Sequence, residues 1–418
     1  MGECFLYRRG AARSGGSGGG AVGTEMTAIG SVLTLSNSLQ RPLKGLRILG
    51  RTTQNGTPTP DAPVALVSPG DDGVLDVWAA GKNLIDYKKA QPGNSNSITV
   101  DESINGVQWT GTYFFIIPVD IPAGTTVAFS CKSEGDDAID SYNLVYEDGT
   151  TAYNILNRAT LAQKRVTQLR VRKRNTSTKN SVTVWDMQLE SVPAGTVDIV
   201  AEYEPYKDIQ ALPLSTPNGL PGIPVASGGN YTDTSGLQWV CDYVDCETVE
   251  YVQMCDYFVF TGNEALGTAG TVGSLGYYAF VSNRTVQGKP NVDSMCNYLK
   301  SRASTVQGSD GSASDRVNIA SGGNGTNFPR LCIAHSVLGT SASSSDSVCL
   351  TALRNWLKAR YNEGNPLIIV SQLATPIRTP LSAEEMAAYA ALHTYAPSTT
   401  IYNDGGAEME VKYMSIGG

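Results

Sequence analysis

The chain has 418 residues, with 31 basic and 39 acidic side chains and a formal net charge of −8. This acidic balance argues against a nucleic-acid-binding protein, and the sequence contains no apolar run long enough for a transmembrane helix. We therefore expect neither a nucleic acid nor a membrane among its partners. The 44 glycines and 20 prolines favour short strands joined by tight turns, and the length is typical of two or three domains.

The first 73 residues divide into two segments. Residues 1–30 contain the run Ser14-Gly-Gly-Ser-Gly-Gly-Gly20, which predicts a flexible Gly/Ser-rich segment. The start lacks the apolar core of a secretory signal, so we expect synthesis in a cytoplasm. Residues 31–73 predict an N-terminal β segment with strands at 31–36 and 43–50, followed by an extended proline-rich connection.

Residues 74–206 predict one antiparallel β domain. Strand candidates alternate with clusters of Gly, Asn, Asp and Pro at the spacing of a β-sandwich. These candidates are residues 74–78, 107–117, 125–131, 142–146, 165–172 and 181–189. The expected fold class is mainly β, with modular antiparallel β-sandwiches and a few short peripheral helices.

Residues 207–254 predict a connector and a β-hairpin. Residues 218–229 are dense in Gly and Pro, which excludes a helix or a long central strand there. The turn signal Asp233-Thr-Ser-Gly236 follows. In the strand that leaves this turn, period two places one set of side chains on a common face. This set is Leu237, Trp239, Cys241 and Tyr243.

Residues 255–418 predict a β-rich C-terminal domain that contains helices near 291–303, 346–363 and 382–394. Asp346 is the expected N-cap of the second helix, and Gly364 follows its end. Ser382 and Glu385 have the spacing of a capping box for the third. Further strands are expected at 257–261, 277–281, 366–373, 399–402 and 408–413.

Several blocks of the sequence resemble minor structural and tail proteins of bacteriophages. The segment 218–245 resembles one that recurs in these proteins, and similar blocks occur before and after it. The other blocks are Thr57-Pro-Thr-Pro-Asp-Ala-Pro63, Gly81-Lys-Asn-Leu84, residues 374–389 and Asn403-Asp-Gly-Gly-Ala-Glu-Met-Glu-Val411. The resemblance implies a virion component of the tail fibre or baseplate, made in the host bacterial cytoplasm, with residues 31–73 as its attachment segment.

The end of the 74–206 domain carries a second resemblance. Trp185-Asp-Met-Gln-Leu-Glu190, followed by Glu202-Tyr-Glu-Pro-Tyr206, is similar to the last strand and exit of carbohydrate-binding-module-like jelly rolls in phage structural proteins. This resemblance implies a jelly roll for the domain and a host cell-surface glycan as ligand. Other tail or baseplate proteins are the implied partners. A homo-oligomer is implied as well, with a trimer favoured by analogy with fibres.

The cysteines do not form a metal-binding pattern. None of the eight cysteines is spaced as Cys-x-x-Cys, and the chain has two histidines, so a zinc site of usual spacing is not expected. Cysteines of a cytoplasmic product are expected to be reduced and to pack as small apolar residues. Two pairs stay open as disulfides if the protein meets oxidising conditions: Cys241 with Cys246, and Cys332 with Cys349.

Catalytic residues are not evident either. Cys332 and His335 fall on opposite faces if their segment is a strand, which argues against a nucleophile pair. Adjacent carboxylates are explained by turn chemistry and helix capping. Asp71 and Asp72 are plausible oxygen ligands for a structural calcium ion, but no loop shows a full calcium motif. We therefore expect no enzyme, no catalytic metal and no cofactor.

Aromatic and basic side chains are the candidate ligand contacts. Sugar rings stack their C–H faces on Trp and Tyr rings, although core packing is the alternative for each such residue. The aromatic candidates are Trp109, Tyr113 and Phe114 on one candidate strand, and Tyr277 and Tyr278 on another. Alternation along 165–174 also gathers a basic group on one exposed strand face. That group is Arg170, Arg172 and Arg174, which either protects a solvated edge or contacts an acidic glycan or a neighbouring subunit.

The sequence thus predicts a non-enzymatic phage virion protein that attaches to the particle and recognises the host surface, with a glycan as the expected ligand. Two alternatives stay open. One is a tail-associated polysaccharide depolymerase, which would need distant carboxylates to meet in a cleft. The other is a purely structural connector or decoration protein.

Overall fold

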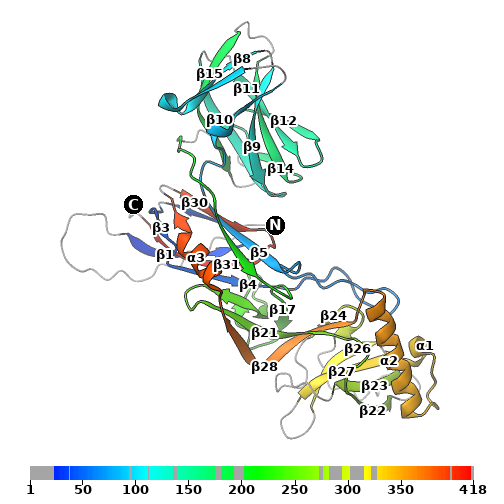
Figure 1. Cartoon of the computed structure of the whole chain (residues 1–418). Helices are drawn as coiled ribbons and strands as arrows, with labels where there is room; N and C mark the ends of the chain where they lie inside the picture. Colours follow the sequence, from blue (N-terminus) through cyan, green and yellow to red (C-terminus); the bar gives the residue numbers. More distant parts are fainter. Residues whose placement is uncertain are drawn as a thin grey trace, which may run out of the picture.

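The computed structural model has a mainly β fold, which confirms the expected fold class. Figure 1 shows three lobes: a β-sandwich, a central lobe of sheets, and a distal sheet covered by helices. The structure describes residues 23–36, 38–93, 97–111, 113–134, 139–174, 180–192, 202–272, 276–281, 294–301, 315–321, 327–395 and 398–415.

Two antiparallel sheets face each other in the central lobe. The larger sheet has the order β1 (Thr24–Gly30), β31 (Glu408–Ser415), β4 (Gly45–Leu49), β20 (Tyr243–Asp245), β21 (Glu250–Val259), β28 (Ile368–Pro380), β24 (Met295–Cys296). The smaller sheet has the order β16 (Gln210–Ser215), β5 (Val74–Gly81), β30 (Ser398–Asn403), β2 (Val32–Ser36). A two-stranded sheet of β29 (His393–Thr394) and β3 (Arg41–Pro42) lies beside them.

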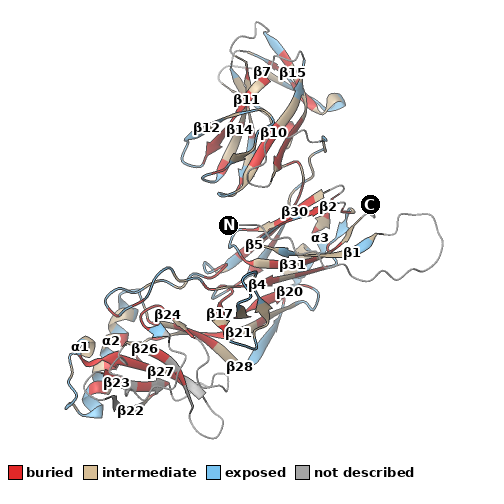
Figure 2. Cartoon of the chain, turned by 180° about the vertical axis from the view of Figure 1, so that it is seen from behind, coloured by how far each residue is buried: buried red, intermediate tan, exposed pale blue. Residues whose placement is uncertain are grey.

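The apolar core of the central lobe lies between these two sheets. Exposed and buried residues alternate along β2, so Leu33 and Leu35 point inward. Leu46 and Ile48 of β4 belong to the same buried cluster from the opposite sheet. Figure 2 shows the resulting buried stripes along the strands. The turn predicted near 403–406 connects β30 to β31, and these two strands lie in different sheets.

The sandwich consists of two five-stranded sheets. One has the order β13 (Thr160–Leu161), β10 (Thr126–Ser133), β15 (Ser181–Ser191), β8 (Gly106–Thr110), β7 (Ser97–Asp101). The other has the order β12 (Thr151–Ile155), β11 (Ile139–Tyr146), β14 (Val166–Lys173), β9 (Phe114–Ile121), β6 (Gln91–Pro92). With β8 to β15 counted as the first to the eighth strand, the sheets read 6-3-8-1 and 5-4-7-2, which is the strand order of a jelly roll.

The predicted strands of the sandwich are present, with one difference. The single strand predicted over 107–117 is two strands, β8 and β9, which belong to different sheets. Gly111 lies between them with a φ of 135°, a conformation that suits glycine and turns the chain from one sheet to the other. Short 3-10 helices, η1 (Tyr87–Lys89) and η2 (Glu102–Ile104), complete this lobe.

The sandwich is inserted between neighbouring strands of the central lobe. β5, which begins the predicted 74–206 domain, pairs with β16 and β30 of the smaller central sheet. Ala79 of β5 stands directly opposite Gln210 of β16. The strands β21 and β28 similarly flank the distal lobe and pair with each other in the larger sheet. The strands at the boundaries of the predicted domains, β5, β16, β21 and β28, therefore all belong to the sheets of the central lobe.

The distal lobe combines a five-stranded sheet with helices. Its sheet has the order β22 (Leu266–Val272), β23 (Gly276–Val281), β27 (Asn327–Ala334), β26 (Arg316–Ser321), β25 (Lys300–Ser301). The helices are α1 (His335–Leu338) and α2 (Asp346–Asn362), and α2 buries Cys349, Leu353 and Leu357 against the sheet.

Two of the three predicted helices are confirmed. α2 matches the helix predicted at 346–363, although Ser345 occupies the N-cap position instead of Asp346. α3 (Ala383–Ala391) matches the third and has the predicted capping box, in which Ser382 and Glu385 each accept the backbone N–H of the other. None of the helices in the described part of the chain has the length and apolar character needed to cross a bilayer.

The helix predicted near 291–303 is wrong over the residues described there, which contain β24 and β25 instead. β24 pairs with β28, and Asn297 extends this contact because its side-chain Oδ1 accepts the N–H of Ile368 at 2.8 Å. Tyr298 is buried in the distal core. These tertiary contacts hold the segment extended and override its local helical pattern.

The middle of the predicted connector and hairpin forms a small three-stranded sheet, β17 (Gly222–Val225), β19 (Gln238–Cys241) and β18 (Tyr231–Thr232), whereas β16 and β20 near its ends belong to the two central sheets. Asp233 fixes the turn because its Oδ1 accepts the N–H of Ser235 and its Oδ2 accepts the indole N–H of Trp239 at 2.9 Å. Trp239, Cys241 and Tyr243 share one apolar cluster, as the period-two pattern predicts, whereas Leu237, the fourth residue predicted on this face, is 42% exposed and lies outside it.

Candidate functional site

The predicted aromatic contacts divide between core and surface. Trp109 is 1% exposed, and its ring packs edge-on to Phe115 in the sandwich core. Tyr277 is fully buried in the distal core. Neither ring can stack on a ligand in this fold. Tyr113 is 58% exposed just before β9, and the side chain of Tyr278 lies outside the described residues.

The predicted arginines lie on or just after β14. Arg170 and Arg172 are half-buried and alternate with residues of the sandwich core, so they occupy the outer face of their sheet. Arg174 follows the strand, and its Nε lies 3.3 Å from Oδ2 of Asp140. The structure therefore brings Arg170 and Arg172 together and gives Arg174 a carboxylate partner.

Cross-strand pairing adds three neighbours to the two arginines. Arg170 stands opposite Asn143 on β11, and Asn143 stands opposite Tyr153 on β12. Arg172 stands opposite Phe114 on β9. The Arg170 guanidinium carbon lies 5.0 Å from the centroid of the Phe114 ring, and that of Arg172 lies 5.7 Å from the Tyr153 ring. We call these five outward residues the cationic face.

The rings of the cationic face hold the guanidinium groups by cation–π contact. Tyr153 is also 60% exposed, so its ring is accessible to a ligand. An accessible aromatic ring between cationic groups and an amide is the kind of surface that binds a sugar with acidic substituents. The strands β9, β14, β11 and β12 that build this face are labelled in Figure 1.

Two polar atoms of the cationic face are buried without a hydrogen-bond partner in the described structure: Asn143 Oδ1 and Arg170 Nε. Asn143 is only 9% exposed, although it faces outward. A buried polar atom without a partner costs about 1–3 kcal/mol, so each such atom needs an explanation. Neither atom has accessible surface, so neither can bond a ligand in this conformation.

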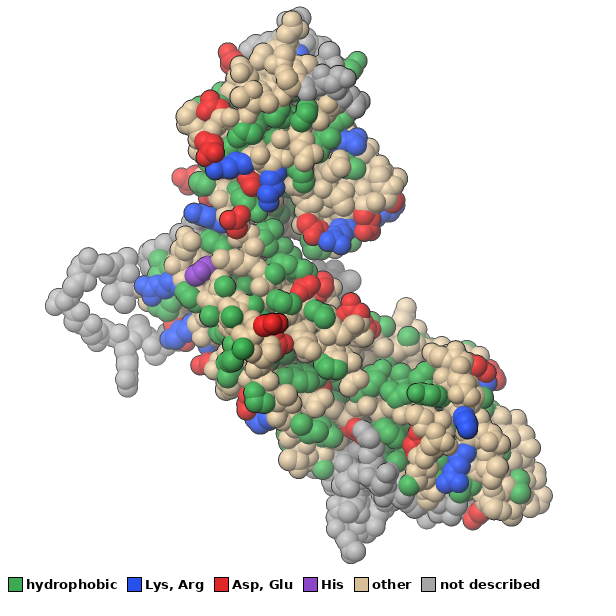
Figure 3. Space-filling model, in the orientation of Figure 1, with side chains coloured by type: hydrophobic (Ala, Val, Ile, Leu, Met, Phe, Trp, Pro, Cys, Tyr) green, Lys and Arg blue, Asp and Glu red, His purple; other side chains and the backbone are tan. Residues whose placement is uncertain are grey.

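The charges around the cationic face are already paired. Arg165 binds Asp120 through two side-chain hydrogen bonds of 2.7 Å. The Lys164 ammonium donates to Asp148 and holds the pKa of that carboxyl below its usual range. Figure 3 shows basic and acidic side chains interspersed along the lower rim of the sandwich. Among the described residues, Arg170 and Arg172 form no such ion pair, which leaves the face with positive charge.

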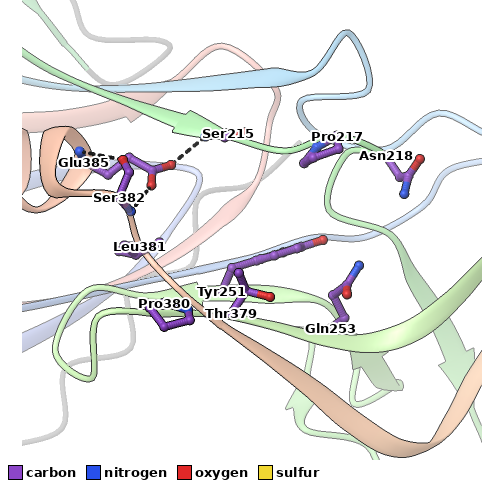
Figure 4. Close-up of a pocket in the computed structure, with 10 residues that line it drawn as sticks. All are labelled: Ser215, Pro217, Asn218, Tyr251, Gln253, Thr379, Pro380, Leu381, Ser382 and Glu385. Carbon is purple, nitrogen blue, oxygen red and sulfur yellow. Dashed lines mark hydrogen bonds between the residues drawn. The ribbon is translucent and has the colours of Figure 1, made fainter.

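A separate pocket of about 360 Å³ lies in the central lobe, where β28 passes the start of α3 (Figure 4). Its one carboxylate among the described lining residues is Glu385, which accepts the N–H groups of Ser215 and Ser382. The hydroxyl of Tyr251, another lining residue, donates to Asp242 at 3.1 Å. These polar groups already have protein partners, so we assign the pocket a structural role.

Asp242 is the most perturbed carboxylate near this pocket. Burial raises its pKa to about 7, and hydrogen bonds from the backbone N–H groups of Cys255 and Met254 oppose that rise. Both N–H groups lie 2.7 Å from Asp242 Oδ1, where the pairing of β21 with β28 shifts register. Asp242 thus caps an irregular backbone at a position 1% exposed, and it is closed to a substrate.

Neither a metal cluster nor a disulfide is present among the described residues. No group of three or more His, Cys, Asp or Glu side chains there is arranged to hold a metal ion. The seven cysteines described are free thiols, so neither of the open cysteine pairs is bonded. Asp72 Oδ1 accepts the N–H of Val74 at 3.4 Å, which is the bond of a local turn.

Sequence reasoning missed two residues of the cationic face, Asn143 and Tyr153. The signal for Asn143 was a polar residue within the apolar run of the predicted strand 142–146, between Tyr142 and Leu144. The signal for Tyr153 was period-two alternation within 151–155. Both patterns gain meaning only when the sheet order places β11 beside β14 and β12 beside β11.

Comparisons with protein-family models, with curated proteins and with solved structures find no match. The case for a function therefore rests on the sequence blocks described above and on the geometry of the cationic face.

Proposed function

We propose that this chain is a non-enzymatic component of a bacteriophage tail or baseplate that attaches to the particle and binds a host cell-surface glycan. The sequence blocks that resemble phage tail proteins support the setting. The observation that carries the binding proposal is the exposed Tyr153 ring beside Arg170 and Arg172, which have no carboxylate partner among the described residues.

The cationic face suits an acidic glycan better than a neutral one. A guanidinium group forms two parallel hydrogen bonds with a carboxylate, and Arg170 and Arg172 have no carboxylate partner among the described residues. The exposed Tyr153 ring offers a stacking surface for the sugar. A homo-oligomer, for which we propose a trimer by analogy alone, would convert weak single-site affinity into avidity.

Binding is tested with the full-length protein on immobilised polysaccharides, some containing uronic acids and some neutral. We expect uronate-dependent binding that weakens with salt. Arg172→Ala should reduce it about tenfold, because a charge-assisted contact contributes about 1.5 kcal/mol or more. Arg165→Ala is the matched control, since it makes the same charge change at a residue already paired with Asp120. An equal loss in both variants contradicts the proposal.

The setting is tested separately with labelled antibodies against the protein on purified phage particles. Label at the tail or baseplate is expected, and label confined to bacterial surfaces without particles overturns the proposed setting. Release of new reducing ends from a bound polysaccharide would point to a depolymerase. Strong label on particles without binding to any glycan would point to a purely structural connector or decoration protein.

A further inference from the structure

The larger sheet of the central lobe ends in a strand with one open edge. Among the described residues, β1 pairs with β31 alone. Successive residues of an antiparallel strand direct their N–H and C=O groups to alternate sides, so about half of β1 presents these groups away from β31. Figures 1 and 2 place β1 at a margin of the central lobe, away from the distal lobe. This edge can therefore accept a further strand.

Other ends of the central sheets carry features that block such pairing. At the opposite end of the larger sheet, the part of β28 beyond β24 contains Pro376 and Pro380, which have no N–H to donate. In the smaller sheet, β16 contains Pro213 and contacts α3. β1 contains neither proline nor lysine, and it pairs with β31 in one unbroken register. Its one charged side chain, Glu25, is bound to Lys44. The sequence of β1 thus lacks the usual protection of an edge strand.

The side chains along β1 suit a sheet that continues past it. Met26 and Ala28 are half-buried and pack against the core between the two central sheets. Ile29, on the other face of the strand, is 42% exposed. Val32 begins β2, the end strand of the smaller sheet, and is 45% exposed. This margin of the lobe thus combines partly exposed apolar side chains with a strand edge that is open for pairing.

We propose that this edge binds a second copy of the chain, with the two β1 strands antiparallel about a two-fold axis through Thr27. This register pairs the strands over their full length and sets Met26 opposite Ala28 of the partner subunit, which continues the apolar core. It sets Glu25 opposite Ile29 of the partner subunit, so no like charges meet. Any other axis shortens the ladder, and an axis through Glu25 also places two carboxylates opposite each other.

The contact is isologous, because the same strand contributes to both sides of it. It joins two seven-stranded sheets into one and leaves the sandwich with its cationic face free, since that face lies in another lobe. The inference does not depend on the proposed function. Combined with the trimer proposed above by analogy, it gives a hexamer with two-fold and three-fold axes, and without a trimer it gives a dimer.

Cysteine cross-linking of the full-length protein tests the register. In a Cys4→Ser background, Thr27→Cys should form a covalent dimer under mild oxidation, because the two Cα atoms lie about 5 Å apart in this register, within the range of a disulfide. Thr24→Cys is the matched control on the same strand, since the two copies of residue 24 lie about 20 Å apart. Non-reducing gels measure the dimer. Its absence for Thr27→Cys, or an equal yield for Thr24→Cys, overturns the proposal.

Sedimentation tests the contact without a new cysteine. The wild type should associate through a two-fold step as its concentration rises, and Thr27→Lys should weaken this step at least tenfold because two lysines meet at the axis. Thr351→Lys makes the same change at an exposed position of α2 and should associate like the wild type. A melting temperature equal to that of the wild type checks that Thr27→Lys is folded. A wild type without the two-fold step, or a step that Thr27→Lys leaves unchanged, contradicts the proposal.

Discussion

Replacing Asp242 by Asn should stabilise the central lobe above neutral pH, and by progressively less as the pH falls toward 3.8. The carboxyl has a pKa of about 7 in the folded chain against 3.8 when exposed. For an acid with a raised folded pKa, the stabilisation is complete below 3.8 and is lost as the pH rises through 7. The rise corresponds to about 4 kcal/mol between the two protonation states, and more than half of it is lost between pH 5 and pH 8.

The amide of Asn keeps the shape of the side chain and still accepts the N–H groups of Met254 and Cys255. It carries no charge, so the cost of burying a carboxylate disappears. Calorimetric melting of wild type and Asp242→Asn at pH 5 and pH 8 tests this, with hydrogen exchange of residues 250–259 as the local measure. A variant that is less stable than the wild type at pH 8, or equally shifted at both pH values, would refute the reasoning.

Three further predictions follow from other residues. Hydrogen bonds from Ser235 and Trp239 lower the pKa of Asp233 to about 2. The ionised carboxylate therefore stabilises the folded chain above pH 3.8, and this stabilisation is lost as the pH falls toward 2. Asp233→Asn should melt at a lower temperature than wild type at pH 7, and the difference in melting temperature should vanish at pH 2. Ser382→Ala removes the cap of α3 and should lower the unfolding free energy by about 1 kcal/mol in urea titrations, whereas an unchanged midpoint contradicts that role. Gly50→Ala places a Cβ 1.7 Å from the Leu220 carbonyl oxygen. The strands must then move apart, so the central lobe should become sensitive to protease. Protease resistance equal to that of the wild type would disprove the close packing.

Local sequence patterns predicted the positions of the strands better than they predicted which strands pair. Period-two alternation located β2 and β14 within a few residues, because buried and more exposed side chains alternate along each of them. The placement of β5 in the central lobe depends on its pairing with β16, which is 130 or more positions away in the chain. No local signal carries that pairing. The helix predicted near 291–303 is wrong for the same reason, because Asn297 accepts a hydrogen bond from Ile368, which is distant in the sequence.

The candidate site was predictable only in part. Alternation along β14 showed that Arg170 and Arg172 share a face. The exposure of the aromatic candidates was harder to predict. Trp109 and Tyr113 lie only four positions apart, yet Trp109 is in the core and Tyr113 is exposed. The sequence does not reveal that a turn at Gly111 separates them into different environments. The bulge in β15 next to Trp185 was not predictable either, because residues 181–189 read as one ordinary strand.

The pairing of Ala79 with Gln210 has a consequence for how such a protein can diversify. The chain leaves the central lobe and returns to it on adjacent strands, so any inserted module needs ends only about 5 Å apart. Recombination or a designed graft at these two points would exchange the sandwich while every pairing of the central sheets is kept. Under the function proposed above, host range and particle assembly would then be inherited as separate traits of one polypeptide.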